Sequence, residues 1–240
     1  MTFTASFLLA SLLCFINSHA WIVPQETLVL PRQEAISNEI PSHVRSFWMK
    51  RALQALDELV SPCPYEAFGA VIVNHTTYLP DDIGDLICIG ANAISTGNPT
   101  LHGEMAATNN CTAVLSDPDG HYKLSPAEIQ KAWHQLTLYT TAEPCPMCSA
   151  AIRWAGFKEC VYGTSAATLA ANSWSLIDIS SEEVFERSSN LKPSTRLISN
   201  IASNETDPYF QWQNDPHAEC PGGCARKEDS CSPIHAHRGT

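Results

Sequence analysis

The sequence predicts an α/β fold in which helices cover both faces of a sheet. Short, almost continuously apolar runs, typical of strands buried on two faces, occur at residues 68–73 and 86–90, and further strands are expected at residues 136–140 and 159–163. Segments with helical periodicity or helix-capping sequences alternate with these runs. Strands that alternate with helices form layered α/β structures. A chain of 240 residues is long enough for one such core and short for two.

Each helix is expected for a local reason. In the first, over residues 42–60, apolar side chains recur every three or four positions, and two prolines follow it. A capping-box sequence, Ser125 to Glu128, starts a short helix that ends before Leu136. Further helices are expected over residues 100–115, 146–154 and 166–176, and a fifth strand over 195–201. Residues 208–212 either pack as a C-terminal helix or close over a pocket.

Composition divides the chain into four parts. Residues 1–20 contain an apolar run of signal-peptide length followed by Ser18-His19-Ala20, whose small residues stand where a signal peptidase cuts. We expect a secretory signal peptide, with an uncleaved membrane anchor as the alternative because no Lys or Arg precedes the run. Residues 21–41 are expected to form an N-terminal arm, residues 42–213 the folded domain, and residues 214–240 a tail that contains Cys and His.

A signal peptide implies a secreted protein without a membrane segment after cleavage. Three sequons, beginning at Asn74, Asn110 and Asn204, are candidates for glycosylation in that compartment. The net charge of −11 repels polyanions at long range, so nucleic acid is disfavoured as a partner. Ten cysteines indicate either disulfides or a bound metal.

Two segments carry the residue types of a catalytic metal site: His102-Gly103-Glu104, and Pro144-Cys145-Pro146-Met147-Cys148. Cysteines three positions apart on a helix lie on one face, so both sulfurs can bind one ion. Pro146 places Cys145 at the helix cap and Cys148 in the first turn, where unpaired backbone N–H groups favour the thiolate. His102 would supply a third ligand and leave the fourth position open, as in catalytic zinc sites.

Glu104 is the expected catalytic group of this site. In the zinc-dependent base deaminases that this pair of motifs resembles, zinc lowers the pKa of water at the open position, which makes hydroxide available to attack an amidine-like carbon that carries an exocyclic amine. Glu104 would take the proton from this water, pass it to the ring nitrogen and help to protonate the departing ammonia. The alternatives are a disulfide or redox pair for Cys145 and Cys148, and a solvated helix carboxylate for Glu104.

H-x-E followed by P-C-x-x-C is the pattern of zinc-dependent base deaminases. Residues 42–213 resemble the cytidine deaminase-like superfamily, in particular its guanine deaminase and tRNA-adenosine deaminase branch with a CMP/dCMP-type deaminase domain. Beside the two motifs, the matching segments are residues 68–73, 90–92, 98–101, 138–142 and 151–155. The resemblance implies a three-layer α/β/α sandwich with a five-stranded mixed sheet, one Zn²⁺ per chain and a homodimer.

The resemblance also implies substrate-binding residues. Asn92 corresponds to an asparagine that hydrogen-bonds the base or sugar in relatives, and an ordinary turn asparagine is the alternative. Phe68 either flanks the base or packs in the core. Guanine deaminases of this branch carry an acidic residue after the fourth strand, where residues 163–170 contain none, so guanine is favoured without being specified. Gly103 stands where the usual pattern has Ala, a change that is expected to be tolerated.

Three hypotheses follow. The leading one is a secreted zinc hydrolase that converts an exocyclic amine of a free nucleobase or nucleoside, with a purine such as guanine favoured, to a carbonyl with release of ammonia. A second places the base within RNA, as in tRNA-adenosine deamination, and requires a basic channel that the charge of −11 disfavours. A third is a catalytically silent, secreted zinc-binding interaction protein, against which the intact Glu104 argues.

The cysteines are then divided between metal and disulfides. With Cys14 in the signal peptide and Cys145 and Cys148 at the metal, seven cysteines remain. An odd number leaves at least one unpaired within the chain, and Cys88, in its apolar strand, is the expected free thiol.

Overall fold

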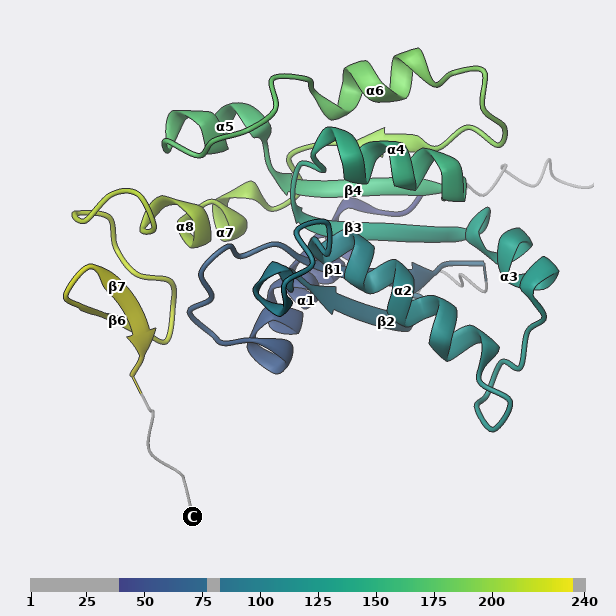
Figure 1. Ribbon diagram of the computed structural model, residues 1–240, viewed down its shortest axis with the longest axis horizontal. Helices are drawn as coiled ribbons and strands as arrows, with labels where there is room; N and C mark the ends of the chain where they lie inside the picture. The colour runs from purple at the N-terminus through teal and green to yellow at the C-terminus, as the bar shows by residue number, and fades with distance from the viewer. Residues whose placement is uncertain (1–38, 77–82, 235–240) are drawn as a thin grey trace, which may run out of the picture. The chain divides into compact units, whose positions relative to one another are not determined.

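The computed structural model describes residues 39–76 and 83–234 and contains a five-stranded mixed sheet with the order β2-β1-β3-β4-β5 (Figure 1). The strands are β1 (Gly69–Asn74), β2 (Asp85–Ala91), β3 (Leu136–Ala142), β4 (Glu159–Thr164) and β5 (Arg196–Ile198). β1 is antiparallel to β2 and β3, whereas β3, β4 and β5 run parallel. The α/β class and the five-stranded mixed sheet are therefore confirmed.

Eight α-helices and one 3-10 turn are present in the described chain. They are α1 (Ser42–Leu59), η1 (Ile94–Thr96), α2 (Gly103–Ser116), α3 (Pro126–Trp133), α4 (Pro146–Ala155), α5 (Ala166–Ala171), α6 (Ser181–Arg187), α7 (Ser203–Thr206) and α8 (Pro208–Gln211). α5 is shorter than expected because Ser173, with a φ of 63°, is in the left-handed region and ends the helical path. In this part of the chain, no helix combines the length and apolar character needed to span a membrane.

The sheet is covered on both faces. Along β1, Ala70 and Ile72 pack in one apolar cluster with residues of α2, α3 and α4, whereas Val71 and Val73 pack in another with residues of α1. This alternation is the two-residue period of a strand. Figure 1 shows the resulting three layers, with α2 in front of the sheet and α1 behind it.

A close approach between β2 and α2 fixes the helix that carries His102 and Glu104 at its start. A Cβ atom on Gly90 would lie 2.2 Å from the backbone nitrogen of Ala107, so only glycine allows this packing distance. A disulfide between Cys88 and Cys111 joins the same two elements. α2 is therefore held against β2 both by contact and covalently.

The prediction that Cys88 is the free thiol is wrong. Cys88 faces α2, where Cys111 lies with a Cα–Cα distance of 5.3 Å, and the two form a disulfide. In addition to the two cysteines of the metal site, the buried Cys160 of β4 is the unpaired cysteine among the described residues. An apolar strand sequence identifies buried thiols, but it does not show which one has a cysteine opposite.

The C-terminal region forms a disulfide-linked hairpin of β6 (Cys224–Lys227) and β7 (Ser230–Pro233). Cys220 pairs with Cys231 within this region, and Cys224 pairs with Cys63 in the loop after α1. The expected signal peptide, most of the expected arm and residues 235–240 lie outside the described residues.

Candidate metal centre and active site

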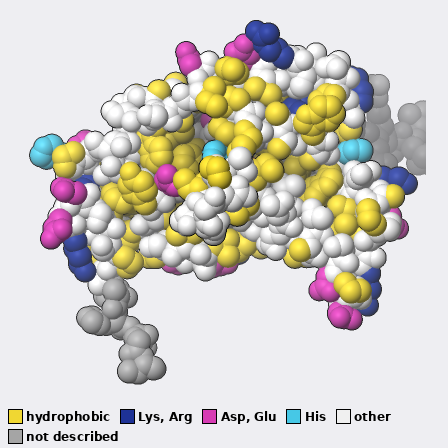
Figure 2. Space-filling view, in the orientation of Figure 1, with side chains coloured by type: hydrophobic (Ala, Val, Ile, Leu, Met, Phe, Trp, Pro, Cys, Tyr) yellow, Lys and Arg dark blue, Asp and Glu magenta, His cyan; other side chains and the backbone are white. Residues whose placement is uncertain are grey.

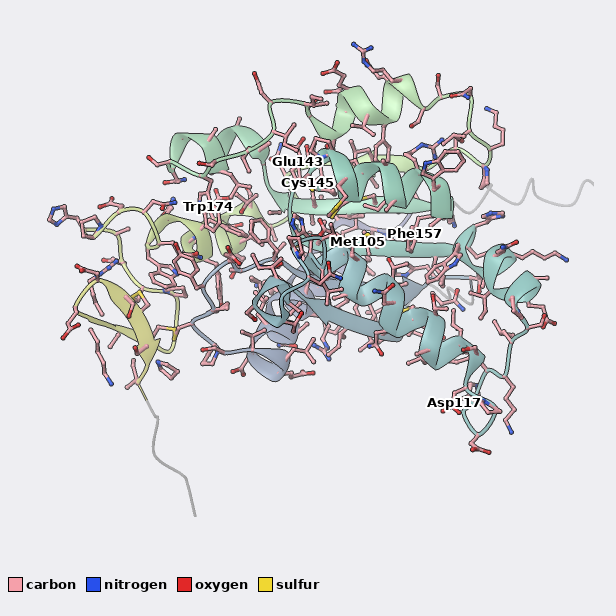
Figure 3. All side chains as sticks on the ribbon, in the orientation of Figure 1. Met105, Asp117, Glu143, Cys145, Phe157 and Trp174 are labelled. Atoms are coloured by element: carbon pink, nitrogen blue, oxygen red, sulfur yellow. A yellow bond between two sulfur atoms is a disulfide. The ribbon has the colours of Figure 1, made fainter. Side chains whose placement is uncertain are left out.

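The two sequence motifs meet at the N-terminal ends of two helices. His102 is the N-cap of α2 and Cys145 is the N-cap of α4, with Pro146 at the first helical position and Cys148 in the first turn. Figure 3 shows Cys145 and Glu143 at the start of α4, close to Met105 at the start of α2. Because helix N-termini carry partial positive charge, both ends favour anionic side chains here.

The three side chains fit a tetrahedral zinc ion. The Nδ1 atom of His102 lies 3.5 Å from Cys145 Sγ and 3.7 Å from Cys148 Sγ, and the three ligand atoms lie within 4.8 Å of one another. Zn–N and Zn–S bonds of ordinary length at a tetrahedral angle would separate nitrogen and sulfur by about 3.6 Å. Within residues 39–76 and 83–234, these three side chains form the cluster whose ligand atoms are placed to hold one metal ion.

The electrostatics of the thiols favour a bound cation. Hydrogen bonds from Cys148 and His102 lower the pKa of Cys145 to about 4, although burial opposes this. The hydrogen bond to Cys145 and burial both raise the pKa of Cys148, and the hydrogen bond to Cys145 raises the pKa of His102. The neighbours of Cys145 thus favour its thiolate, the form of cysteine that binds a metal.

Glu104 is buried, with 4% of its surface exposed, and lies in the first turn of α2. Burial raises the pKa of its carboxyl group, which also has a side-chain hydrogen bond to Cys148. The start of α2 packs tightly on the segment before β1: a Cβ on Gly103 would lie 2.3 Å from the carbonyl oxygen of Phe68. Gly103 therefore fits at this position, whereas an Ala side chain would require the backbone to shift.

A cavity of about 410 Å³ opens beside these groups, and Figure 2 shows hydrophobic side chains gathered around a hollow near the middle of this face. It is lined by Glu66, Phe68, Asn92, Ile94, Pro99, His102, Glu104, residues 143–147, Ala166, Leu169, Trp174, Ser175, Leu176, Ile177 and Ile179. The lining thus brings together every expected metal-ligand, catalytic and substrate-binding residue except Cys148, which lies buried behind it.

Phe68 and Asn92 stand on the same wall of this cavity. Phe68 packs edge-on against Trp174, with ring centroids 5.4 Å apart, and also against Phe210 of α8. The run at residues 208–212 therefore packs beneath the cavity wall. Asn92 follows β2, where its backbone N–H donates to the carbonyl oxygen of Phe68 and its side-chain amide donates to Glu66.

Sequence reasoning missed Glu66, Trp174 and the role of Glu143. One carboxylate oxygen of Glu143 accepts from the backbone N–H of Ala166, and the other accepts from the N–H and hydroxyl of Ser181. Glu143 therefore holds the two ends of the segment that lines one side of the cavity. The position of Glu143 directly before the Pro144-Cys145 motif could have identified it as a site residue. The sequence around Glu66 contains no such motif.

The three sequons lie away from these groups. Asn74 ends β1, Asn110 is in α2, and Asn204 is in α7. The side-chain amide of Asn110 donates to the carbonyl oxygen of Ile89 at 2.9 Å, and Asn204 is exposed. Nothing in these positions bears on the cavity.

Fold and site together define a class: a three-layer α/β protein with a His-Cys-Cys ligand set at two helix N-termini and a buried glutamate beside it is a zinc-binding deaminase domain. Residues 42–164 match the family model of the cytidine and deoxycytidylate deaminase zinc-binding region, and the chain belongs to this family.

Curated relatives differ in their substrates. The chain is 36% identical over 116 residues to a guanine deaminase of Bacillus subtilis, covering 48% of this chain and 61% of the relative. It is 31% identical to a probable cytosine deaminase of Schizosaccharomyces pombe, covering 49% and 56%, and 32% identical to a tRNA-specific adenosine deaminase of Haemophilus influenzae, also covering 49% and 56%. The chain thus spans less than two thirds of each relative, and the set as a whole leaves the substrate unresolved.

A solved structure supports the fold. A mutant of the protein NE0047 in complex with 8-azaguanine matches with a TM-score of 0.53 at 17% identity, covering 72% of this chain and 86% of that chain. At this identity the likeness concerns the arrangement of helices and strands alone.

Proposed function

We propose that this domain is a zinc-dependent hydrolase that releases ammonia from a free nucleobase or nucleoside, with a purine such as guanine favoured. The observation that carries the proposal is the position of Glu104, a buried carboxyl group that lines the same cavity as the ligands His102 and Cys145. A buried acid at a metal-ligand cluster needs a chemical reason, because burial of an ionisable group is costly.

Each group has a role in this reaction. Zinc, when bound by His102, Cys145 and Cys148, supplies a Lewis acid that lowers the pKa of water toward neutrality. The carboxylate of Glu104 accepts a proton from water, delivers it to the ring nitrogen of the base, and assists the departure of the amine as ammonia. Phe68 and Trp174 provide flat apolar surface for a ring, and Asn92 provides a hydrogen bond that orients it.

The cavity favours a small substrate. Its lining contains the carboxylates Glu66, Glu104 and Glu143 and, within the described chain, no Lys or Arg, so it offers nothing to a phosphate backbone. Its volume of about 410 Å³ is in the range of small-molecule sites. The match to a guanine deaminase supports a purine, and the match to tRNA-specific deaminases supports the alternative, a base within RNA.

Secretion, glycosylation and dimer formation complete the proposal. Three disulfides in the described chain support an oxidising compartment, in agreement with the signal-peptide sequence. In that compartment Asn74 and Asn204 are available for glycosylation, whereas Asn110 would first lose its hydrogen bond to the backbone of β2. The homodimer is proposed from the family resemblance alone.

The test is an ammonia-release screen. Zinc-loaded protein would be incubated with guanine, adenine, cytosine and their ribonucleosides, and with single-stranded RNA, with Glu104→Ala as the control. Release from a base or nucleoside by the unmodified protein alone supports the proposal. Release from RNA alone favours the second candidate, and background release from every compound favours a silent zinc-binding protein.

A further inference from the structure

Glu66 occupies an unusual place in the loop between α1 and β1. Its φ of 57° lies in the left-handed region, which non-glycine residues seldom adopt. Its N–H donates to the side-chain oxygen of Gln213 at 2.8 Å, and its carbonyl oxygen accepts from the N–H of Phe68 at 2.7 Å. A contact from the distant Gln213 and one from the nearby Phe68 therefore hold this residue in a conformation that its own chemistry disfavours.

The side chain of Glu66 is directed to Asn92. Oε2 accepts from Asn92 Nδ2 at 2.7 Å, and both residues line the cavity that contains His102, Cys145 and Glu104. This hydrogen bond fixes the orientation of the Asn92 amide, because only its NH₂ group can donate to a carboxylate. The amide oxygen of Asn92 is buried and has no hydrogen-bond partner among the described residues.

The pair is therefore a source of acceptors. An ionised carboxylate only accepts hydrogen bonds, and one of the two N–H donors of the Asn92 amide is engaged with Glu66. A buried acceptor without a partner is costly, and a ligand that donates to it removes that cost. The side of the cavity that carries Glu66 thus complements a substrate edge that donates hydrogen bonds.

We infer that Glu66, acting with Asn92, is a specificity-determining residue that binds a donor edge of the substrate. This inference rests on the proposed function and assigns Glu66 to recognition rather than to proton transfer. Two donor sources are consistent with it: the ring N–H of a free base at the position where a sugar would be attached, and the 2′ and 3′ hydroxyls of a ribonucleoside. Both sources donate hydrogen bonds. Attachment of ribose to the base removes the ring N–H and adds the 2′ and 3′ hydroxyls.

Binding measurements distinguish these sources. Titration calorimetry would use zinc-loaded protein with Glu104→Ala, which prevents turnover, and the ligands guanine, guanosine and 2′,3′-dideoxyguanosine, with the matching cytosine set. We expect Glu66→Gln to weaken the preferred ligand by at least about tenfold, since a hydrogen bond to a charged group is lost. If the ring N–H is bound, the free base loses affinity; if the hydroxyls are bound, the ribonucleoside loses affinity and the dideoxynucleoside does not.

Two further variants separate recognition from a structural role. Glu58→Gln, on the exposed surface of α1, is the matched control and should leave every affinity unchanged. Glu66→Gly relieves the left-handed conformation, so its Tm should be unchanged or higher while ligand affinity falls. Unchanged affinities in Glu66→Gln, or a lower Tm with normal affinity in Glu66→Gly, would overturn the inference, as would the absence of binding to all six ligands.

Failure of the proposed function gives a different result. If the protein with intact Glu104 released no ammonia from these ligands and yet bound one of them with an affinity that depended on Glu66, the activity would be refuted and the acceptor pair would stand. If ammonia were released equally well with Glu66→Gln at low substrate concentration, the activity would stand and the role of Glu66 would be refuted.

Discussion

The disulfide between Cys63 and Cys224 links the C-terminal hairpin to the loop that carries Glu66, and its removal tests how the cavity wall is held. Replacing both cysteines by serine breaks this link without touching the cavity lining. The two residues are 161 positions apart, so chain entropy alone assigns the link about 5 kcal/mol, and removal of a native disulfide typically costs about 2–5 kcal/mol. For a domain of this size that corresponds to a Tm lower by on the order of 10 °C.

The same variant should affect ligand binding. Cys224 packs with Cys63 and Trp212. Gln213, which follows Trp212 in the chain, accepts a hydrogen bond from the backbone N–H of Glu66. When the hairpin is released, we expect the apparent affinity for the preferred ligand to fall while kcat at saturation changes little, because Glu104 and the metal ligands are untouched.

The Cys220–Cys231 disulfide provides the control. It closes a separation of 11 residues within the tail, for which the same relation gives about 3 kcal/mol, and it does not reach the cavity loop. Thermal unfolding followed by circular dichroism, with calorimetric titration of the ligand, would be compared for both double variants. An unchanged Tm in Cys63→Ser/Cys224→Ser, or an equal loss of affinity in Cys220→Ser/Cys231→Ser, would refute the reasoning.

Three further predictions follow. Gly103→Ala should lower kcat/KM by about a hundredfold, because a Cβ 2.3 Å from the Phe68 carbonyl oxygen would displace the start of α2 by about 1 Å. Steady-state kinetics on protein with normal zinc content would measure this loss, and a fully active variant would contradict the prediction. Glu159→Gln should destabilise the fold by about 3–5 kcal/mol in urea unfolding, because Arg45, 4% exposed and 2.9 Å from that carboxylate, loses its buried counter-charge; an unchanged midpoint contradicts this. Chelation by dipicolinate should lower the Tm of the zinc-loaded protein, and zinc but not magnesium should restore it, because a ligand bound only to the folded state stabilises that state; Cys145→Ser should show no such response.

The central elements were predictable because their sequence signals are local. β1, β3 and β4 are buried on both faces, so nearly every residue is apolar or small, and the pattern is short and unambiguous. The capping box of α3 is formed by Ser125 and Glu128, as its spacing predicts. The metal cluster was predictable for a similar reason, since its cysteines lie within one helical turn.

Other features depend on tertiary contacts that sequence does not display. α6 and α7 are short and have no long apolar stripe. Glu143 anchors Ser181 at the start of α6, and the hydroxyl of Thr164 donates to the hydroxyl of Thr206 in α7. The pairing of Cys88 with Cys111 depends on the register of α2 against β2. Sequence reveals neither relation.

Glu66 shows the limit most clearly. Its neighbours in sequence give no pattern, and its significance arises because β2 brings Asn92, and the segment after α8 brings Gln213, to the same point. Function at this position is created by the fold, whereas function at His102, Cys145 and Cys148 is visible in the spacing itself.

The most direct test of the account compares zinc content and ammonia release in the unmodified protein and in Glu104→Gln on the best substrate of the screen. The account predicts one zinc per chain in both proteins and a loss of kcat by a factor of about 10²–10⁴ in the variant, as expected for the removal of a general acid–base group. Equal turnover in the two proteins, or zinc that binds without His102, Cys145 and Cys148, would contradict it.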